Sequence, residues 1–254
     1  MDITVVIHTL DDQENIVDCM ESAKLLTDKI IVIDMESRDA TVKLAKKSGA
    51  EIYFFPPASY VEPARNFGIG KASTKWVFLL DTDERLTPEL AEEIKSALVN
   101  PQYSHFKINR KNIFSGVKWL KHGGWWPDQI IRLINKEHFK NWPKQIHSTP
   151  VISGSIRSLK NPLLHYFHGD LESMVTKTII FEDIESNLLF KAKKNVETST
   201  FFRKFLGELY RRLIGNLGFL DGNIGIIEST YQAFSKTITY IYLYEKSRTI
   251  RSLS

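Results

Sequence analysis

The sequence predicts an α/β fold: a mostly parallel sheet flanked by helices, with a helical extension at the C-terminal end. Through the first hundred residues, short apolar runs alternate with segments of helical periodicity. Runs that are apolar almost without a break are typical of strands buried on both faces. The alternation stops at about residue 100, and helical periodicity returns from about residue 171. We therefore expect an α/β domain over residues 1–170 and a helical extension over residues 171–254.

The expected strands of this sheet are four apolar runs, at residues 3–7, 29–33, 51–55 and 76–80. Helices are expected after each of them, over residues 12–25, 39–48 and 61–72 and from Thr87 onward. Asp39 and Thr87 are residue types favoured as N-terminal helix caps, and Pro88 suits a first helical turn. Gly49 suits the end of the second helix. Residues 103–170 hold short strand-like pieces, turns and many aromatic side chains.

Carboxylates follow the apolar runs at three places where strands of the expected sheet end. They are Asp11 or Asp12 after the first run, Asp34 after the second, and Asp81 with Asp83 after the fourth. Open α/β sheets bind their ligands at the carboxyl ends of the strands. Two carboxylates in a D-x-D spacing suit a divalent cation that holds a phosphate, although this spacing arises by chance about once in a chain of this size. A turn role, which Asp also favours, is the alternative for Asp34.

The composition is that of an ordinary globular protein, with 43% hydrophobic residues, 25% charged residues and a net charge of +4. This mild basicity does not indicate a nucleic-acid-binding protein. Residues 201–254 hold eight basic and four acidic residues, so their excess of four equals the net charge of the whole chain. Cys19 is the only cysteine, which excludes an intrachain disulfide and favours a reducing, cytoplasmic compartment. The N-terminus lacks the basic and apolar regions of a signal peptide, and we expect none.

Six segments carry motifs that are specific when taken together. They are ITVVIHTLDDQENI from residue 3, IIVIDMESRDAT from 30, ARNFGIGKASTKWVFLLDTDERL from 64, GWWPDQIIRLINKE from 124, QIHS from 145 and GFLDGNIGIIES from 218. With them, nearly the whole chain resembles glycosyltransferase family 2, and most closely its bacterial branch in lipopolysaccharide-core and related envelope glycan synthesis. The resemblance implies a GT-A fold, the Rossmann-like fold of nucleotide-diphospho-sugar transferases. It also implies a nucleotide-binding part over residues 1–100 and an acceptor-binding part over residues 101–170.

The resemblance assigns several residues to the nucleotide-sugar donor. It implies that Thr9 and Asp11 line the nucleotide pocket and that Asp34 contacts the uracil. It also implies that Arg65 and Asn66 help to position the donor.

Further residues are assigned to the metal and to the reaction. The resemblance implies that Asp83 is the principal ligand of a divalent cation, Mg²⁺ or Mn²⁺, and that Asp81 lies near the ribose and the metal. His147 is a candidate for another metal or phosphate contact, with a structural role as the alternative. Asp128 would be the general base, and Arg132 would support the acceptor or the diphosphate. Without the resemblance, Asp128 reads as a turn residue that follows a proline.

Two positions depart from the family pattern. The family's usual Asn-Glu after the first strand is Asp11-Asp12 here, and the shorter carboxylate at position 12 puts its usual contact in doubt. The usual Glu after the family's later His is Ser148, so any metal or acceptor role of that carboxylate is missing.

The implied reaction is metal-dependent transfer of a sugar, with inversion, from a nucleotide-sugar to a hydroxyl of a saccharide or a lipid-linked saccharide. The donor expected from the family is a UDP-sugar. A polyprenyl-phosphate glycosyltransferase, of the dolichol-phosphate-mannose-synthase type, is a second interpretation, because it shares the GT-A core. A non-catalytic nucleotide-binding GT-A module is a third. The carboxylate set Asp34, Asp81, Asp83 and Asp128 argues against the third.

Three further features allow more than one interpretation. Trp119, Trp125 and Trp126 precede Asp128 and could stack on sugar rings or belong to the core. The adjacent glycines 123 and 124 could form a tight turn or a mobile lid. Near the C-terminus, residues 201–220 form a basic amphipathic pattern with an apolar stripe: Phe202, Phe205, Leu206, Leu209, Leu213 and Leu217. Such a helix could lie on the inner face of an anionic membrane or pack on the α/β domain.

Overall fold

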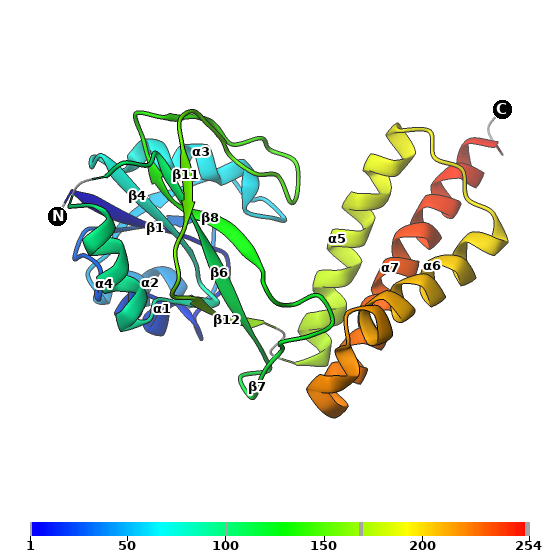
Figure 1. The fold of residues 1–254 in the computed structure, drawn as a ribbon. Helices are drawn as coiled ribbons and strands as arrows, with labels where there is room; N and C mark the ends of the chain where they lie inside the picture. Colours follow the sequence, from blue (N-terminus) through cyan, green and yellow to red (C-terminus); the bar gives the residue numbers. More distant parts are fainter. Residues whose placement is uncertain (1, 100, 168–169, 252–254) are drawn as a thin grey trace. The chain divides into compact units, whose positions relative to one another are not determined.

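The computed structural model describes residues 2–99, 101–167 and 170–251 of the chain and divides into two compact units. The first unit comprises residues 1–111 and 128–165, and the second comprises residues 112–127 and 166–254. We describe each unit by itself (Figure 1). Residues 112–127 thus group with the C-terminal helices, whereas the sequence pattern placed them with the α/β part. This grouping depends on contacts between distant parts of the chain, which no local pattern records.

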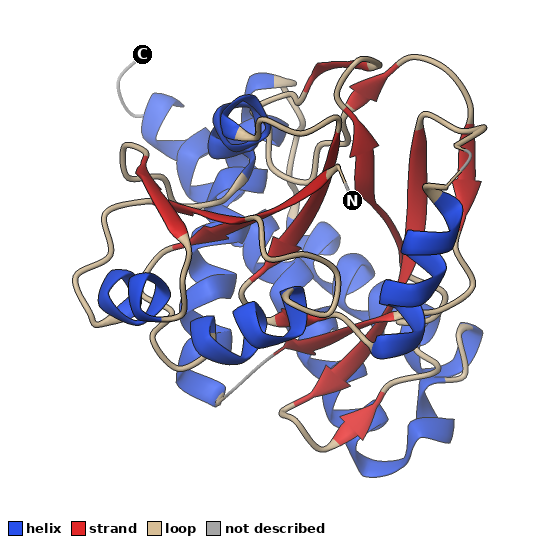
Figure 2. Cartoon of the chain, turned by 90° about the vertical axis from the view of Figure 1, so that its left-hand side faces the viewer, coloured by secondary structure: helices blue, strands red, loops and turns tan. Residues whose placement is uncertain are grey.

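The first unit is built on a parallel sheet, as predicted. Its parallel strands are β1 (Ile3–Thr9), β2 (Ile30–Asp34), β3 (Glu51–Phe54) and β4 (Trp76–Asp81), in the order β3-β2-β1-β4. The antiparallel strand β8 (Gln129–Asn135) pairs with β4, and β6 (His105–Phe114) pairs with β8. The path then continues through β12 (Leu163–Phe167) to β5 (Glu84–Arg85). Figure 2 shows the strands in red.

Short strands complete the described part of the sheet structure. β7 (Lys118–Trp119) pairs antiparallel with β6, and β11 (Ile156–Ser158) pairs parallel with it. β9 (Phe139–Asn141) and β10 (Val151–Ile152) form a separate two-stranded sheet.

Helices cover both faces of β1, β2 and β4, which explains why these strands are apolar almost throughout. The edge strand β3 differs from the prediction, because its residues are exposed or half-buried. Helices α1 (Ile16–Ala23), α2 (Thr41–Lys47) and α4 (Pro88–Ala97) lie on one side of β1 and β4, and α3 (Glu62–Lys71) lies on the other (Figure 1). Alternate residues of β1 accordingly belong to two cores. Val5 packs in the core that includes α1 and α4, and Val6 packs in the core that includes α3.

The helical spacing predicted for α1 and the predicted cap of α4 are confirmed, and the predicted cap of α2 is not. In α1 the residues at helical spacing, Ile16, Cys19, Met20 and Ala23, are all buried. Thr87 caps α4, because its hydroxyl accepts a hydrogen bond from the Leu90 N–H at 3.2 Å. The predicted cap of α2 is wrong by one position: the N-cap is residue 40, and the Asp39 carboxylate accepts from the Thr41 N–H at 2.9 Å.

The second unit is mainly helical. It contains α5 (Leu171–Lys191), α6 (Thr198–Tyr210), the π-helix η1 (Arg211–Gly215), the 3₁₀-helix η2 (Gly218–Asp221) and α7 (Gly222–Arg251). Helices α5 and α6 both pack on α7. Among the described residues, no helix is both long enough and apolar enough to span a membrane.

In the second unit, the glycine-rich segment from Gly218 to Gly225 brings its own backbone into close contact. A Cβ on Gly225 would lie 2.0 Å from the Gly218 carbonyl oxygen, so only glycine allows this approach. Between these glycines, the buried Asp221 carboxylate accepts from the N–H groups of Lys121 and His122 at 2.9 and 2.8 Å. Its other oxygen lies 3.0 Å from His122 Nδ1. This motif therefore fixes the loop that leads to Trp125.

Candidate active site

The carboxyl ends of β1 and β2 bring two predicted donor residues side by side. In the parallel register Thr9 lies opposite Asp34, and His8 lies opposite Asp81 on β4. The hydroxyl of Thr9 and the Oδ1 atom of Asp34 are buried and have no hydrogen-bond partner among the described residues. The other Asp34 oxygen accepts from the Ser37 N–H at 3.0 Å. Because a buried polar atom without a partner costs free energy, these two atoms indicate a ligand that supplies hydrogen bonds.

The two aspartates after β1 organise neighbouring loops. Asp11 has a positive φ of 51°, its N–H donates to Ser37 Oγ at 2.9 Å, and its carboxylate accepts from the Arg38 N–H at 2.6 Å. Asp12 accepts from the hydroxyl of Thr82, the middle residue of the D-x-D motif, at 2.6 Å. The shorter carboxylate at position 12 thus ties the first loop to the D-x-D turn.

Asp81 is held by two buried arginines. One of its oxygens accepts from Arg65 Nη2 at 2.7 Å, and the other accepts from Arg132 Nη2. Burial opposes ionisation of Asp81, but Arg132 and Arg65 outweigh it and hold its pKa well below the usual range. Burial likewise opposes the charge of Arg132, yet Asp81 and Glu84 raise its pKa. Since both Asp81 oxygens bind guanidinium groups, this geometry favours a role in positioning over the predicted role as a metal ligand.

His8 belongs to the same cluster, although no sequence motif singled it out. It is buried, and its Nδ1 accepts from Arg65 Nη1 at 3.2 Å because an arginine can only donate. Its Nε2 then donates to the Ala64 carbonyl at 3.3 Å. Burial, together with the charge of Arg65, lowers the pKa of His8 to about 3, so the ring is neutral. A Cβ on Gly68 would lie 2.7 Å from His8 Nε2, which explains the glycine.

Asp83 differs from Asp81 in its surroundings. It is partly buried, and one of its oxygens lies 3.5 Å from His165 Nε2. Across residues 2–99, 101–167 and 170–251, no three His, Cys, Asp or Glu side chains form a group that could hold a metal ion. A single carboxylate still fits a cation that arrives with a diphosphate, because Mg²⁺ is commonly held by one or two carboxylates and substrate phosphates.

Two further predicted residues fasten the segment around Trp142. The Asn66 side chain donates to the Trp142 carbonyl and accepts from its N–H, both at 2.7 Å. His147 is exposed, has a positive φ of 59°, and its N–H donates to Glu62 at 2.8 Å. Arg65 lies over the Trp142 ring, 5.4 Å from its centroid. The Asn66 side chain thus holds this segment, and the predicted metal or phosphate contact of His147 stays a prediction.

Asp128, the predicted base, ends a chain of alternating charges. Its Oδ2 accepts from Arg110 Nε at 2.8 Å, and Arg110 Nη1 lies 3.7 Å from Glu84. The fully buried Glu84 also accepts from Arg132 Nη2 at 2.5 Å, and Arg132 binds Asp81. The structure therefore connects the predicted base to the predicted donor residues through Arg110 and Glu84, to neither of which the resemblance assigned a role.

The tryptophans of the second unit form an aromatic and basic cluster. Trp119 meets Trp126 edge to face at 5.4 Å, and Trp125 lies 4.6 Å from Phe167. Arg212 lies 5.4 Å from the Trp125 ring and donates to the Gly123 carbonyl at 3.0 Å. The glycine turn predicted at residues 123–124 has positive φ angles and is bonded to the helical segment, which argues for a fixed turn and against a lid.

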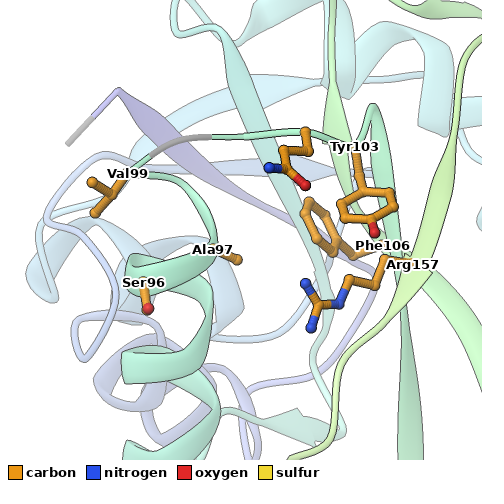
Figure 3. A pocket seen from close by; sticks show the side chains of 7 residues that line it. Ser96, Ala97, Val99, Tyr103, Phe106 and Arg157 are labelled. Atoms are coloured by element: carbon orange, nitrogen blue, oxygen red, sulfur yellow. The ribbon is translucent and has the colours of Figure 1, made fainter.

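A cavity in the first unit lies beside the end of helix α4. It has a volume of about 470 Å³ and is lined by Ser96, Ala97, Val99, Gln102, Tyr103, Phe106 and Arg157 (Figure 3). None of the predicted site residues lines it. Among the lining residues, Arg157 lies over the Tyr103 ring, 5.6 Å from its centroid.

Comparison with known proteins shows which proteins this chain resembles. The family model for glycosyl transferase family 2 matches residues 4–167. A Rickettsia conorii protein, described as an uncharacterized glycosyltransferase, is 26% identical over 259 residues, which cover 96% of this chain and 90% of that protein. A Rickettsia typhi protein of the same description is 26% identical over 265 residues, covering 99% of this chain and 89% of that protein.

Two solved structures show the same fold at low identity. A mannosyltransferase from Pyrobaculum calidifontis, in complex with GDP-Man and Mn²⁺, has a TM-score of 0.53 at 11% identity and covers 91% of this chain and 73% of that chain. S. aureus TarS 1–349, in complex with UDP-GlcNAc, has a TM-score of 0.52 at 13% identity and covers 98% of this chain and 92% of that chain. The predicted GT-A fold is thereby confirmed.

Proposed function

The chain belongs to glycosyl transferase family 2, and we propose that it transfers a sugar from a nucleotide-sugar, with a UDP-sugar as the expected donor, to an acceptor hydroxyl with inversion. One observation carries the donor assignment: the buried Thr9 hydroxyl and Asp34 Oδ1 lack partners at the adjoining ends of β1 and β2. A nucleobase that offers an N–H would satisfy the Asp34 oxygen. The UDP-GlcNAc bound to TarS supports this class of donor.

A divalent cation would bind at Asp83 together with the diphosphate. The mannosyltransferase complex with Mn²⁺ supports a cation in this fold. When bound, it would offset the negative charge that builds on the leaving diphosphate. Asp81 would keep Arg65 and Arg132 in place through its ion pairs with both. A preorganised charge cluster costs no reorganisation during reaction.

Asp128 would accept the proton of the attacking acceptor hydroxyl. Arg110 holds one carboxylate oxygen at 2.8 Å and thereby sets the orientation of the group. A positioned general base contributes about 10²–10⁴-fold to the rate. Asp128→Asn should lower turnover by that factor and leave donor binding intact. A polyprenyl-phosphate acceptor is already ionised and needs little base, so unchanged turnover in this variant would favour that alternative.

The acceptor would be a saccharide or a lipid-linked saccharide of envelope glycan synthesis, in the lipopolysaccharide branch that the sequence resembles. Trp119, Trp125 and Trp126 are candidates for contacts with its sugar rings, because aromatic faces commonly pack on sugars. With such an acceptor, the protein would act at the cytoplasmic side of the membrane. Release of sugar from any donor would exclude the non-catalytic alternative.

Calorimetry with UDP tests the donor site directly. The native chain should bind UDP more tightly with Mn²⁺ than without it, and Asp83→Asn should lose that difference. Asp34→Asn should weaken UDP binding with or without the cation, since it replaces one acceptor oxygen by a donor. Asp18→Asn, an exposed change on α1, is the matched control and should bind as the native chain does. Absence of UDP binding by the native chain under both conditions would refute the UDP assignment.

A further inference from the structure

Helix α6 presents an apolar stripe to solvent. Phe202, Leu206 and Tyr210 are spaced four residues apart and are 68%, 59% and 66% exposed. Ile214 in η1 extends the stripe by another four residues and is also exposed. The opposite side of the helix, with Phe205 half-buried, packs on α7. Of the stripe predicted from the sequence, Phe202 and Leu206 are therefore exposed, whereas Phe205 and Leu209 are half-buried. Phe202, Leu206 and Tyr210 form the exposed row of α6.

The same segment exposes positive charge and hides negative charge. Within residues 198–227, all of which the structure describes, the exposed charged side chains are Arg203 and Arg211. The two acidic residues of this segment are not exposed. Glu208 accepts from Arg211 and Arg212, and Asp221 is buried.

Neighbouring residues extend both features. Lys191 at the end of α5 and Lys193 and Lys194 after it are exposed. The exposed Glu197 at the N-cap of α6 offsets one of these charges, so residues 191–197 add two positive charges before the helix. At the other end, Leu217, Phe219 and Leu220 are exposed apolar residues of the turn into α7.

We propose that the exposed row of α6, with Ile214 and the turn at residues 217–220, is a docking surface for an anionic lipid bilayer. An interfacial helix inserts its apolar side chains at the boundary between headgroups and acyl chains, while its basic residues bind the anionic headgroups. A second copy of the chain fits this surface less well, because a symmetric contact would place the same arginines of both copies together. The surface lies wholly in the second unit, and its binding to lipid does not require the proposed catalytic activity.

Sedimentation with vesicles tests the surface without any sugar donor. The native chain should pellet with vesicles of equal parts phosphatidylcholine and phosphatidylglycerol, and much less with phosphatidylcholine alone. Phe202→Ser should weaken the partition into anionic vesicles at least about tenfold, the factor expected when one large apolar side chain no longer inserts. Arg203→Gln should weaken it about fivefold, the factor for one basic residue near an anionic surface.

Phe54→Ser in β3 is the matched control, because Phe54 is 59% exposed and belongs to the first unit. Its partition should equal that of the native chain. Three outcomes would overturn the proposal: no pelleting with anionic vesicles, equal loss in Phe54→Ser and Phe202→Ser, or a solution dimer that Phe202→Ser abolishes without any lipid binding. All four proteins should keep the native circular dichroism spectrum, because the changed side chains are exposed.

Discussion

Acidification should destabilise the first unit through the neutral His8. The ring has a folded-state pKa of about 3, whereas an unfolded chain restores the ordinary value of 6.5. Between these two values the unfolded chain binds a proton that the folded chain does not bind. The free energy of unfolding must therefore fall as the pH falls through 6.5 toward 3. The cause lies in the structure: Nδ1 already accepts from Arg65, and a proton there would face a guanidinium in a buried site.

The size of this effect follows from the two pKa values. One pKa unit corresponds to about 1.4 kcal/mol, so the complete difference is worth about 5 kcal/mol. Carboxylates also titrate at the acid end of that range. Between about pH 7.5 and about pH 5, where they contribute less, His8 alone should remove about 2 kcal/mol from the free energy of unfolding.

Urea unfolding of the native chain and of His8→Gln measures this contribution. Glutamine does not bind a proton in this pH range, so the variant lacks the titration of His8. Its side chain still offers a hydrogen-bond donor and a hydrogen-bond acceptor at position 8. Subtracting the free energies of unfolding of the two proteins at each pH removes the contributions of the other histidines. The native chain should lose about 2 kcal/mol more than His8→Gln between about pH 7.5 and about pH 5. If the free energies of unfolding of the two proteins changed in parallel with pH, the assignment of a neutral, arginine-bound His8 would be refuted.

Three other changes have consequences for stability that chemical denaturation can measure. Gly68→Ala should cost about 1–3 kcal/mol, because the new Cβ would meet His8 and Val6 at 2.7 and 2.9 Å. Arg132→Met should cost about 3–5 kcal/mol, because it removes the buried guanidinium that the Asp81 and Glu84 carboxylates share. Asp221→Ala should cost about 3 kcal/mol in the second unit, because two backbone N–H groups lose a charged acceptor.

Each change has a control within the chain. Gly70→Ala in the same helix as Gly68 meets nothing within 4 Å and should be neutral or stabilising. Lys75→Met breaks an exposed ion pair with Glu137 and should change stability by no more than about 1 kcal/mol. Asp170→Ala removes an exposed cap of α5 and should cost about 1 kcal/mol. A control that destabilises as much as its partner variant would contradict the corresponding argument.

The sequence by itself determined the parallel sheet and the edge of that sheet at which the proposed donor residues lie. The apolar runs and their spacing required strands buried on both faces, and the residues after those runs had to gather at the carboxyl edge of the sheet. The register of β1, β2 and β4 confirms that Thr9, Asp34 and Asp81 reach this edge. These features are local in the sequence, since a strand's polarity pattern and its end are set within a few residues.

Only the tertiary structure decided how the carboxylates differ from one another. Asp81 and Asp83 share one motif, yet two arginines bind Asp81 while Asp83 lies near His165. Arg110 and Asp128 are 18 positions apart, and Arg65 and Asp81 are 16 positions apart, so no local spacing links them. Packing likewise decided which row of α6 is exposed. Partners that come from distant parts of the chain set charge, burial and exposure, and a residue's own sequence neighbours do not specify those partners.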